Sequence, residues 1–350
     1  KYKTELDNDI AAYSKVVQNS TLQNYGKQSR IAIDSYLEVL GRGGKRIRGA
    51  LTMLGYEMCG GKDHKMILEA ARAIEMIHAY ILIIDDINDR SLTRRGGKAA
   101  HAVMADYYAT HELGPDGLHF GESIAMNAAL SGSHAAQMIM ANLRVDETLR
   151  LMALSILNRG MLVTVHGQFN DIFNEVSGEA TEQDVNNVTE WKTAHYTFLN
   201  PLHIGMILAG ADCHATDAIT PYAMHVGRAF QIVDDILGTF GGEFETGKSP
   251  MDDTREGKRT LLSIYALDHA TPEDKNFLVQ MLGNQNLTKT EFQRCKEIIQ
   301  STGALEYSRE QADKHVDQAV RALEGTKDYW TDEGYGFLRG LAGYLLERKS

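Results

Sequence analysis

Cysteine is scarce in this sequence, and its spacing excludes two classes of protein. Cys59, Cys213 and Cys295 are the only cysteines in 350 residues, and no Cys-x-x-Cys pair is present. This pattern fits neither a disulfide framework nor a cysteine-rich zinc site, so a reducing cytosol is the simplest location. No basic-then-apolar leader opens the sequence, and no apolar run approaches the roughly 20 residues that span a bilayer. We therefore expect a soluble, cytoplasmic protein.

Positive charge is also in deficit. The formal net charge is −11, which argues against a general nucleic-acid-binding protein and is ordinary for a soluble enzyme. Any anionic ligand must then be held by local basic clusters that work against the global charge. Hydrophobic residues make up 43% of the chain and charged residues 24%, a composition that is typical of a globular protein rather than a disordered one.

Proline is rare, and long stretches run without a residue that would break a helix. The whole chain has five prolines, whereas proline inside a helix costs about 3 kcal/mol. Residues 66–89 read as one helix, and its apolar stretch 79–84 predicts burial on all sides. Residues 222–237 read as a second apolar helix, which we expect four glycines between residues 238 and 249 to end.

A third helix has a recognisable start. Thr181 and Asp184 resemble a capping box that opens a helix towards Asn200, and Pro201 predicts a kink there. Strand-like alternation is scarce and no internal repeat is present, so we predict one all-α domain over residues 1–350. Loops are expected at residues 60–63, 114–121 and 240–256. A helical bundle of unknown purpose is the alternative against which each motif must be weighed.

Two acidic motifs each follow an apolar helical run. Asp85 and Asp89 lie four residues apart and share a helix face, with Asp86 about a quarter-turn away. Asp234 and Asp235 follow the second apolar helix. Clustered carboxylates repel one another unless a cation compensates them, and their hard oxygens suit Mg²⁺, which shares its remaining positions with water and phosphate oxygens. One such motif alone is usually a solvated helix end, but two are harder to explain in that way.

Basic residues cluster beside glycines at two positions. GGKRIR (residues 43–48) and RRGGK (residues 94–98) combine cations that suit phosphate oxygens with glycines that allow close backbone approach. Neither matches the phosphate-binding P-loop pattern. His78 lies two helical turns before Asp85 on almost the same face. A lone histidine on an apolar helix is more often a core residue, but this alignment favours a role in binding.

These residues together resemble the trans-prenyl diphosphate synthases, which make geranyl, farnesyl and geranylgeranyl diphosphates. Six markers occur in the order typical of that family: GGKRIR, EMIHAYILIIDDINDRSLTRRG, HGQFND, WKTAHYTF, FQIVDDILGTFG and TGKSPMDDTREGKRT. A single DDxxD motif is weak evidence, whereas six ordered markers between Gly43 and Lys258 are strong evidence. The resemblance implies an all-α, isoprenoid-synthase-type bundle around a deep central cavity, generally assembled as a homodimer.

The resemblance also implies a reaction and a set of residue roles. Isopentenyl diphosphate would condense with an allylic diphosphate, and three Mg²⁺ ions would be held by Asp85, Asp89 and Asp234, with Asp86 and Asp235 in support. The allylic diphosphate would be bound by Arg94, Lys192, Lys248 and Lys258. Isopentenyl diphosphate would be bound by Lys45, Arg48, His78 and Arg95. Thr193 and Gln231 would line the path of the allylic cation, and the final proton would pass to the departing diphosphate.

One departure from the family pattern affects the second acidic motif. Gly238 stands where the family usually has a third aspartate, although members that resemble archaeal geranylgeranyl diphosphate synthases also read DDILG. We interpret the glycine as a subfamily feature that bears on the affinity for the third metal ion.

Product length is the finest prediction that the resemblance supports. In this family the residues four and five places before the first acidic motif help to form the floor of the product tunnel, and here they are Ile81 and Tyr80. Five helical residues span about 7.5 Å, so the Tyr80 ring predicts a short product. We favour the C20 product, geranylgeranyl diphosphate, with the C15 product as the alternative. Tyr80 packing in the core without any role in length remains open.

Three rival readings of the sequence make different predictions. A terpene cyclase would lack an isopentenyl diphosphate site, against which GGKRIR, His78 and Arg95 count. A regulatory subunit of a heteromeric synthase would have broken ligand sets, whereas Gly238 is the single gap. A plain helical scaffold does not account for the ordered markers. The sequence therefore favours the synthase.

Overall fold

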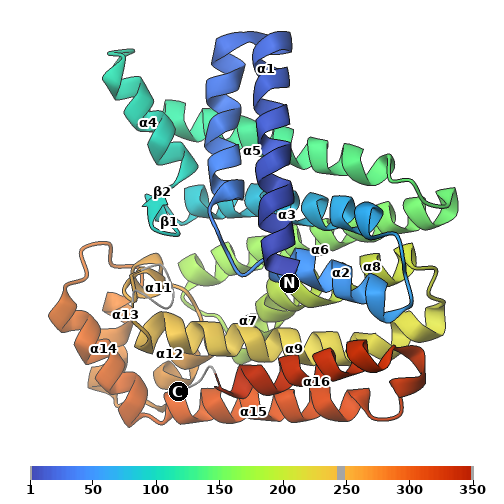
Figure 1. Ribbon diagram of the computed structural model, residues 1–350. Coiled ribbons are helices and arrows are strands. Elements are labelled where there is room, and N and C mark those ends of the chain that lie inside the picture. The colour runs from blue at the N-terminus through green and yellow to red at the C-terminus, as the bar shows by residue number, and fades with distance from the viewer. Residues whose placement is uncertain (1, 243–248, 348–350) are drawn as a thin grey trace.

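The computed structural model describes residues 2–242 and 249–347, which form an almost entirely helical protein (Figure 1). The first half of the chain forms α1 (Tyr2–Gly41), α2 (Ile47–Met58), α3 (His64–Asn88), α4 (Ala100–Thr110), α5 (Gly117–Ala141) and α6 (Glu147–Ser177). The second half forms α7 (Glu182–Val188), the π-helix η1 (Thr189–Leu199), α8 (Asn200–Leu208), α9 (Cys213–Phe240), α11 (Asp252–Glu256), α12 (Leu261–His269), α13 (Pro272–Met281), α14 (Lys289–Ser301), α15 (Ala304–Leu323), the 3-10 turn η2 (Lys327–Tyr329) and α16 (Asp332–Glu347). The described strands are β1 (Thr93–Arg94) and β2 (Gly97–Lys98), which form an antiparallel hairpin. The prediction of an all-α fold is confirmed.

The long helix predicted before the first acidic motif is present as α3. It begins at His64, because the side chain of Asp63 caps it by accepting a hydrogen bond from the Met66 N–H at 3.0 Å. Its apolar stretch packs against α1, α2 and α5, and residues such as Ile77 and Ile83 are almost fully buried. Burial on all sides, as predicted for residues 79–84, is only partly present, because Ala79 and Ile83 are buried and the other four residues are half-buried.

The capping box at Thr181 is also confirmed, but the helix that it opens is not uniform. The Asp184 N–H donates to the Thr181 hydroxyl and the Thr181 N–H donates to the Asp184 carboxylate. α7 then widens into the π-helix η1, which leads directly into α8. Backbone dihedrals stay helical at Asn200 (φ −63°, ψ −44°), so the chain passes Pro201 without leaving the helical conformation. Short π-helices are rare and are frequently found at functional sites.

The expected end of the second apolar helix is wrong by several residues. α9 continues through Gly238 to Phe240. A glycine inside a helix costs about 1 kcal/mol relative to alanine, which does not outweigh the burial of neighbours such as Val233 and Ile236. The loop at residues 60–63 is confirmed, but α5 begins at Gly117 inside the second predicted loop, and α11 lies inside the third.

Two long helices place the two acidic motifs at the same end of the bundle. α3 lies above α9 in Figure 1, and α9 packs between η1 and α15. The hairpin that follows α3 and the short helix α11 that follows α9 lie on the same side of the molecule in that view. The carboxyl-terminal ends of α3 (Asn88) and α9 (Phe240) are therefore brought towards each other, although about 150 residues separate them in the sequence.

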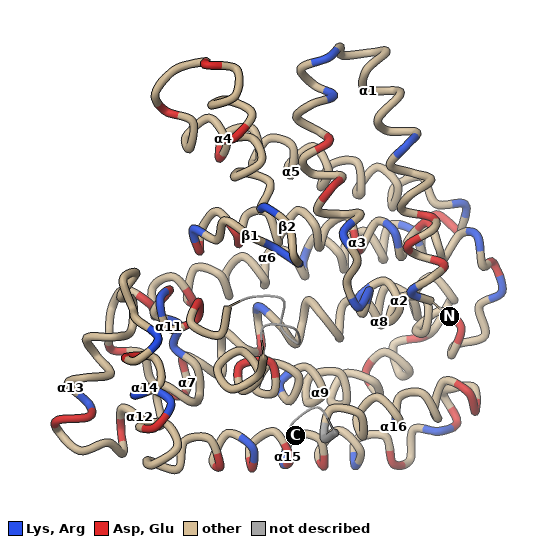
Figure 2. Tube along the Cα trace, turned by 60° about the vertical axis from the view of Figure 1, so that its left-hand side comes forward, with Lys and Arg blue, Asp and Glu red and all other residues tan. Residues whose placement is uncertain are grey.

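One described helix, α6, is long and apolar enough to cross a membrane when judged by length and composition alone. The sequence pattern did not indicate it. Only 22% of its most apolar window is buried, yet α6 packs against α5, α7, α8 and η1 as part of the bundle. Figure 2 shows few charged residues along α5 and α6 and many along α15. A single helix of this kind is weak evidence for a membrane span, and its exposed face requires another explanation.

Candidate active site

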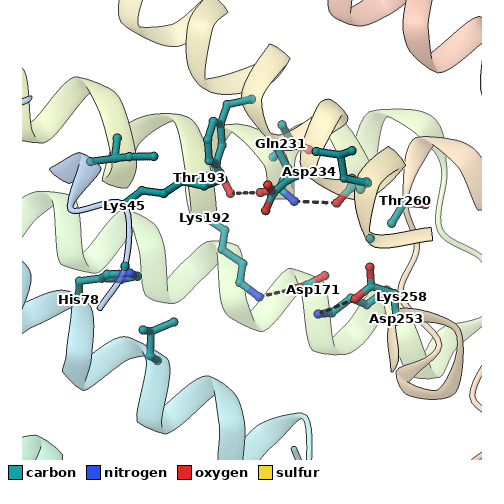
Figure 3. A pocket seen from close by; sticks show the side chains of 18 of the residues that line it. Lys45, His78, Asp171, Lys192, Thr193, Gln231, Asp234, Asp253, Lys258 and Thr260 are labelled. Atoms are coloured by element: carbon teal, nitrogen blue, oxygen red, sulfur yellow. Dashed lines mark hydrogen bonds and ion pairs between the residues drawn. The ribbon is translucent and has the colours of Figure 1, made fainter. Parts of the chain in front are cut away.

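A cavity of about 610 Å³ opens between α3, α6, η1 and α9 (Figure 3). Among the residues predicted from the sequence, the cavity is lined by Lys45, Arg48, His78, Arg94, Arg95, Lys192, Thr193, Gln231, Asp234, Asp235 and Lys258. These come from segments as far apart in the sequence as the loop before α2 and the loop before α12. All six sequence markers therefore contribute residues to the lining of one cavity, and the contribution of HGQFND is Asp171.

Asp85 and Asp89 contact two lysines that line this cavity. Lys192 Nζ lies 3.2 Å from Asp85 Oδ1, and Lys258 Nζ lies 3.6 Å from Asp89 Oδ2. Asp86 points elsewhere: it is fully buried and accepts hydrogen bonds from Arg94. The motif therefore divides into two aspartates that contact cavity-lining lysines and one that anchors an arginine, in keeping with their helical spacing.

A chain of hydrogen bonds orders the opposite wall. The Thr193 hydroxyl donates to Gln231 Oε1 at 2.7 Å, and Gln231 Nε2 donates to Asp235 Oδ1 at 2.7 Å. Burial raises the pKa of Asp235 well above its ordinary value, and the negative charges of Asp253 and Asp234 raise it further. Cations are therefore favoured at this wall, because they would relieve the repulsion between its carboxylates.

Asp253 of α11 is a functional candidate that the sequence interpretation missed. A Cβ atom added at Gly238 would lie 2.8 Å from Asp253 Oδ2. The Asp253 carboxylate therefore occupies the space beside Gly238, where a third aspartate of the second motif would project. A signal was present, because Asp253 lies in the marker TGKSPMDDTREGKRT.

Two lysines hold the carboxylates of different helices together. Lys192 contacts Asp171 of α6 at 2.7 Å as well as Asp85, and Lys258 contacts Asp253 at 3.5 Å as well as Asp89. Burial alone would lower the pKa of each ammonium group, but the surrounding carboxylates raise it above the ordinary value. Both lysines therefore carry a positive charge inside the cavity.

The position of η1 depends on two close backbone approaches. A Cβ atom at Gly167 of α6 would lie 2.7 Å from the backbone nitrogen of Lys192, and one at Gly227 of α9 would lie 2.5 Å from Ala194 Cα. Such distances are too short for a side chain of any size, so glycine at both positions lets η1 fit between α6 and α9. Lys192 and Thr193 project from η1 into the cavity (Figure 3).

Guanidinium groups lie beside a half-buried histidine on the remaining wall. Arg48 Nη1 and Arg95 Nη2 lie 3.2 Å and 3.4 Å from His78 Nε2. Burial lowers the pKa of His78 well below its ordinary value, and the nearby arginines lower it further. His78 is therefore a neutral imidazole whose Nε2 accepts from both arginines. Arg48 also donates to Thr197 at 2.7 Å, which fixes its direction.

Arg46 of the GGKRIR segment has a structural role instead. It is 4% exposed, and it donates to Asp7 at 2.8 Å and to the Leu40 carbonyl at 2.8 Å. Its backbone adopts the left-handed conformation (φ 52°), which is uncommon for a residue other than glycine. These contacts hold the loop in a shape from which Lys45 and Arg48 reach the cavity.

The donor set fits magnesium, although it does not form a complete metal site by itself. Within residues 2–242 and 249–347, no three carboxylate, histidine or cysteine side chains converge closely enough to hold a metal ion. Magnesium is usually bound by one or two protein carboxylates together with water and substrate phosphates. Asp85 and Asp89 on one wall and Asp234 on the other supply that chemistry, and the remaining ligands would come from a diphosphate.

Five predicted residues of the α3 segment, Tyr80, Ile81, Asp85, Asp86 and Asp89, are not among the residues that line the cavity. Tyr80 and Ile81 are half-buried and pack against the core around α3. Lys248 lies outside the described residues.

Glu175 of α6, which the sequence interpretation also missed, has its pKa raised to about 8 by burial and by the charges of Asp171 and Asp89.

Comparisons with known proteins agree with this geometry. The chain is 31% identical to the geranylgeranyl diphosphate synthase of Saccharolobus solfataricus over 319 residues, which cover 90% of this chain and 91% of the relative. It is 31% identical to the geranylfarnesyl diphosphate synthase of Aeropyrum pernix over 315 residues, covering 89% and 92%. The fold matches a crystal structure of geranylgeranyl pyrophosphate synthase from Corynebacterium glutamicum complexed with isoprenyl diphosphate and magnesium, with a TM-score of 0.93, 28% identity and 99% of each chain covered.

The family model described as Polyprenyl synthetase matches residues 30–299. This match covers well over half of the chain and includes every element that lines the cavity. The chain belongs to the polyprenyl synthetase family.

Proposed function

We propose that this prenyltransferase condenses isopentenyl diphosphate head-to-tail with an allylic diphosphate, in a magnesium-dependent reaction that yields a short all-trans prenyl diphosphate. One observation carries the proposal: a single cavity contains two chemically different anion sites. Carboxylates and lysines line one side of it, and arginines around the neutral His78 line the other. Two substrates that both carry a diphosphate require two such sites.

The carboxylate side is the proposed site of the allylic diphosphate. Asp85, Asp89 and Asp234 would hold magnesium there, three ions in all, supported by Asp235 and Asp253. Magnesium bound at this side would neutralise the diphosphate and make it a better leaving group. Lys192, Lys258 and Arg94 line the same region and would bind the diphosphate oxygens; Lys248 stays a prediction for the same task.

The hydrogen-bonded chain on η1 and α9 is the proposed support for the allylic cation. The Thr193 hydroxyl proton is engaged by Gln231, so the oxygen lone pairs of Thr193 are left to face positive charge in the cavity. Gln231 is itself held by Asp235. Dipoles that are oriented before the reaction stabilise a developing charge without reorganising. These two side chains would therefore stabilise the cation until the double bond of isopentenyl diphosphate attacks it.

The arginine side is the proposed site of isopentenyl diphosphate. Lys45, Arg48 and Arg95 supply the positive charge and His78 orients both arginines. His78 is an unsuitable general base, because its Nε2 lone pair already accepts from guanidinium groups and its pKa is low. The proton lost after condensation would pass to the departing diphosphate.

The arginine side also separates this proposal from its rivals. A terpene cyclase ionises an allylic diphosphate but has no second diphosphate to bind, so the cluster of Arg48, His78 and Arg95 would have no purpose. A regulatory subunit would not need an ordered Thr193–Gln231–Asp235 chain. Asp253 beside Gly238 also removes the one gap on which that reading depended.

The favoured product is geranylgeranyl diphosphate, with farnesyl diphosphate as the alternative. The Saccharolobus and Corynebacterium relatives are named geranylgeranyl synthases, and the Aeropyrum relative is named a geranylfarnesyl synthase. Tyr80 lies five residues before Asp85 on α3, half-buried against the core. Its ring is proposed to help stop the growing chain.

An elongation assay tests the function directly. The protein would be given Mg²⁺, labelled isopentenyl diphosphate and C5, C10 or C15 allylic starters in turn, and chain length would be read by chromatography after dephosphorylation. We expect products that end at C20, and we expect Asp85→Ala to lower the rate by at least 100-fold because it removes a proposed metal ligand. Elongation from none of the starters would refute the synthase, and a cyclic hydrocarbon without label would indicate the cyclase.

The role of Asp253 is tested by moving its carboxylate. Asp253→Ala should raise the Mg²⁺ concentration needed for half-maximal activity about tenfold, because one oxygen donor is lost from the acidic wall. The double variant Gly238→Asp/Asp253→Ala should recover most of the affinity, since the new side chain enters the space that Asp253 vacates. Calorimetric binding of pyrophosphate at several Mg²⁺ concentrations gives a readout that is independent of turnover. Equal Mg²⁺ dependence of the wild type and Asp253→Ala would contradict the assignment.

The chain-length role of Tyr80 has its own test. Tyr80→Ala should lengthen the product by one or more isoprene units, because it removes the ring that is proposed to block the tunnel. Tyr80→Phe keeps the ring and should leave the product unchanged. Product analysis under the same conditions decides the matter, and an unaltered length for Tyr80→Ala would show that Tyr80 only packs in the core.

We also propose that the protein is a cytoplasmic homodimer. Every exposed residue of α6 between Leu162 and Val176 is uncharged, and Phe169 and Phe173 are exposed among them. An exposed apolar face of this kind on a helix is typical of a protein interface. A second copy is the occupant that we propose, because a two-fold axis would pack this uncharged face against itself. Three free cysteines are in keeping with a reducing cytoplasm.

Light scattering tests the dimer. The wild type should have twice the mass of the chain, and Phe173→Glu should dissociate it because two carboxylates would be buried in the interface. Val279→Glu on α13 is the matched control, since Val279 is also exposed but lies away from α6. A monomeric wild type, or a Phe173→Glu variant that remains dimeric, would overturn the proposed interface.

A further inference from the structure

Arg42, the residue that directly follows α1, connects the β1–β2 hairpin to the body of the protein. Its Nη1 donates to the carbonyl of Arg94 at 3.1 Å and to the carbonyl of Lys98 at 2.6 Å. Its Nη2 forms an ion pair with Glu38 one turn earlier. Arg42 is not among the residues that line the cavity. Its contacts are therefore with the backbone of the hairpin and not with a ligand.

The hairpin leaves space for this guanidinium at one position. A Cβ atom added at Gly97 would lie 2.6 Å from Arg42 Cζ. Gly97 pairs with Arg94 across the hairpin, and Lys98 pairs with Thr93. The missing side chain at Gly97 thus allows Arg42 to reach carbonyls on both strands. We call this arrangement, formed by Arg42, the two carbonyls and the space at Gly97, the Arg42 clamp.

The clamped hairpin carries two neighbouring arginines that point in different directions. Arg94 donates to the buried Asp86 beside the carboxylate wall, whereas Arg95 lies 3.4 Å from His78 on the arginine wall. Arg95 also donates to the carbonyl of Arg42 at 3.2 Å. The backbone at Arg95 is left-handed (φ 51°), a conformation that costs energy in a non-glycine residue and persists only where surrounding contacts hold it.

We infer that Arg42 is a positioning residue that sets both diphosphate sites at once through the hairpin. This inference rests on the proposed function, because it takes Arg94 and Arg95 to face the two diphosphates. Arg42 holds the backbone on both sides of the turn, and the direction of each arginine follows from that backbone. A two-residue pair of strands has few ladder hydrogen bonds of its own, so contacts from outside decide its position.

Two substitutions should damage the clamp independently. Arg42→Met keeps an unbranched apolar stem and removes the donors, and Gly97→Ala pushes the guanidinium away from the carbonyls. Each should raise KM for both isopentenyl and allylic diphosphates about tenfold, since misplacement of a binding group by even an ångström is costly. The double variant should lose no more than either single variant, because both act on the same contacts.

Matched variants separate the clamp from general effects on stability. Gly41→Ala adds a methyl group that meets nothing within 4 Å, and Arg30→Met removes an ion pair with Asp34 elsewhere on α1. Glu38→Gln removes the ion pair of Arg42 but leaves its carbonyl contacts. All three should keep KM within about twofold of the wild type, and Arg42→Lys should recover part of the loss in Arg42→Met.

Hydrogen exchange of the backbone amides at residues 93–98 gives a second readout that needs no turnover. Arg42→Met and Gly97→Ala should speed this exchange at unchanged melting temperature, whereas the control variants should not. Additive losses in the double variant, or unchanged KM and unchanged exchange in both single variants, would overturn the inference. A wild type without elongation activity would refute the proposed function instead, and the exchange would still report on whether Arg42 holds the hairpin.

Discussion

Repulsion between like charges is the constraint on which the rest of this structure depends. Carboxylates of α9, α6 and α11 line one cavity, and the lysines beside them contact the carboxylates at the end of α3, in a chain whose net charge is already −11. Burial raises the pKa of Asp235 and of Glu175, and the negative charges of neighbouring carboxylates raise both further. Lys192 and Lys258 offset it by each contacting carboxylates of two different segments. In the proposed reaction, magnesium and diphosphate would balance the charges in a second way.

The helices serve to bring these charges together at fixed positions. α3 and α9 are long and deeply buried, so their acidic ends are held by packing along their whole length. η1 fits between α6 and α9 only because Gly167 and Gly227 lack side chains. Its π-helical turns set Lys192 beside Asp85 and Thr193 beside Gln231. Mobile loops could not hold carboxylates and lysines within 4 Å of one another at fixed positions.

The sequence predicted the elements and the charged wall residues well, because both depend on local pattern. Apolar periodicity predicted α3, and motif spacing predicted that Asp85 and Asp89 share a face. It did not predict that Asp253 would lie beside Gly238, because that contact is tertiary and joins residues 15 positions apart in the sequence. The end of α9 was also placed too early, since tertiary burial outweighs the weak helix propensity of one glycine. Arg42 gave no signal at all, because its role depends on a space at Gly97 that no local pattern reveals.

The two anion sites differ in a way that suits two diphosphates with different fates. The diphosphate on the arginine side must stay attached to carbon throughout the proposed reaction, whereas the one on the carboxylate side must leave. Guanidinium groups around a neutral histidine bind an anion firmly. A metal ion makes a bound diphosphate a better leaving group than guanidinium groups do. Arg94 and Arg95 are adjacent in the chain, yet the pKa of Arg94 is raised by its carboxylate neighbours, while burial and other arginines lower that of Arg95. One short hairpin therefore contributes to both electrostatic environments. In the proposed reaction, the relative placement of the two diphosphates would therefore depend on this hairpin.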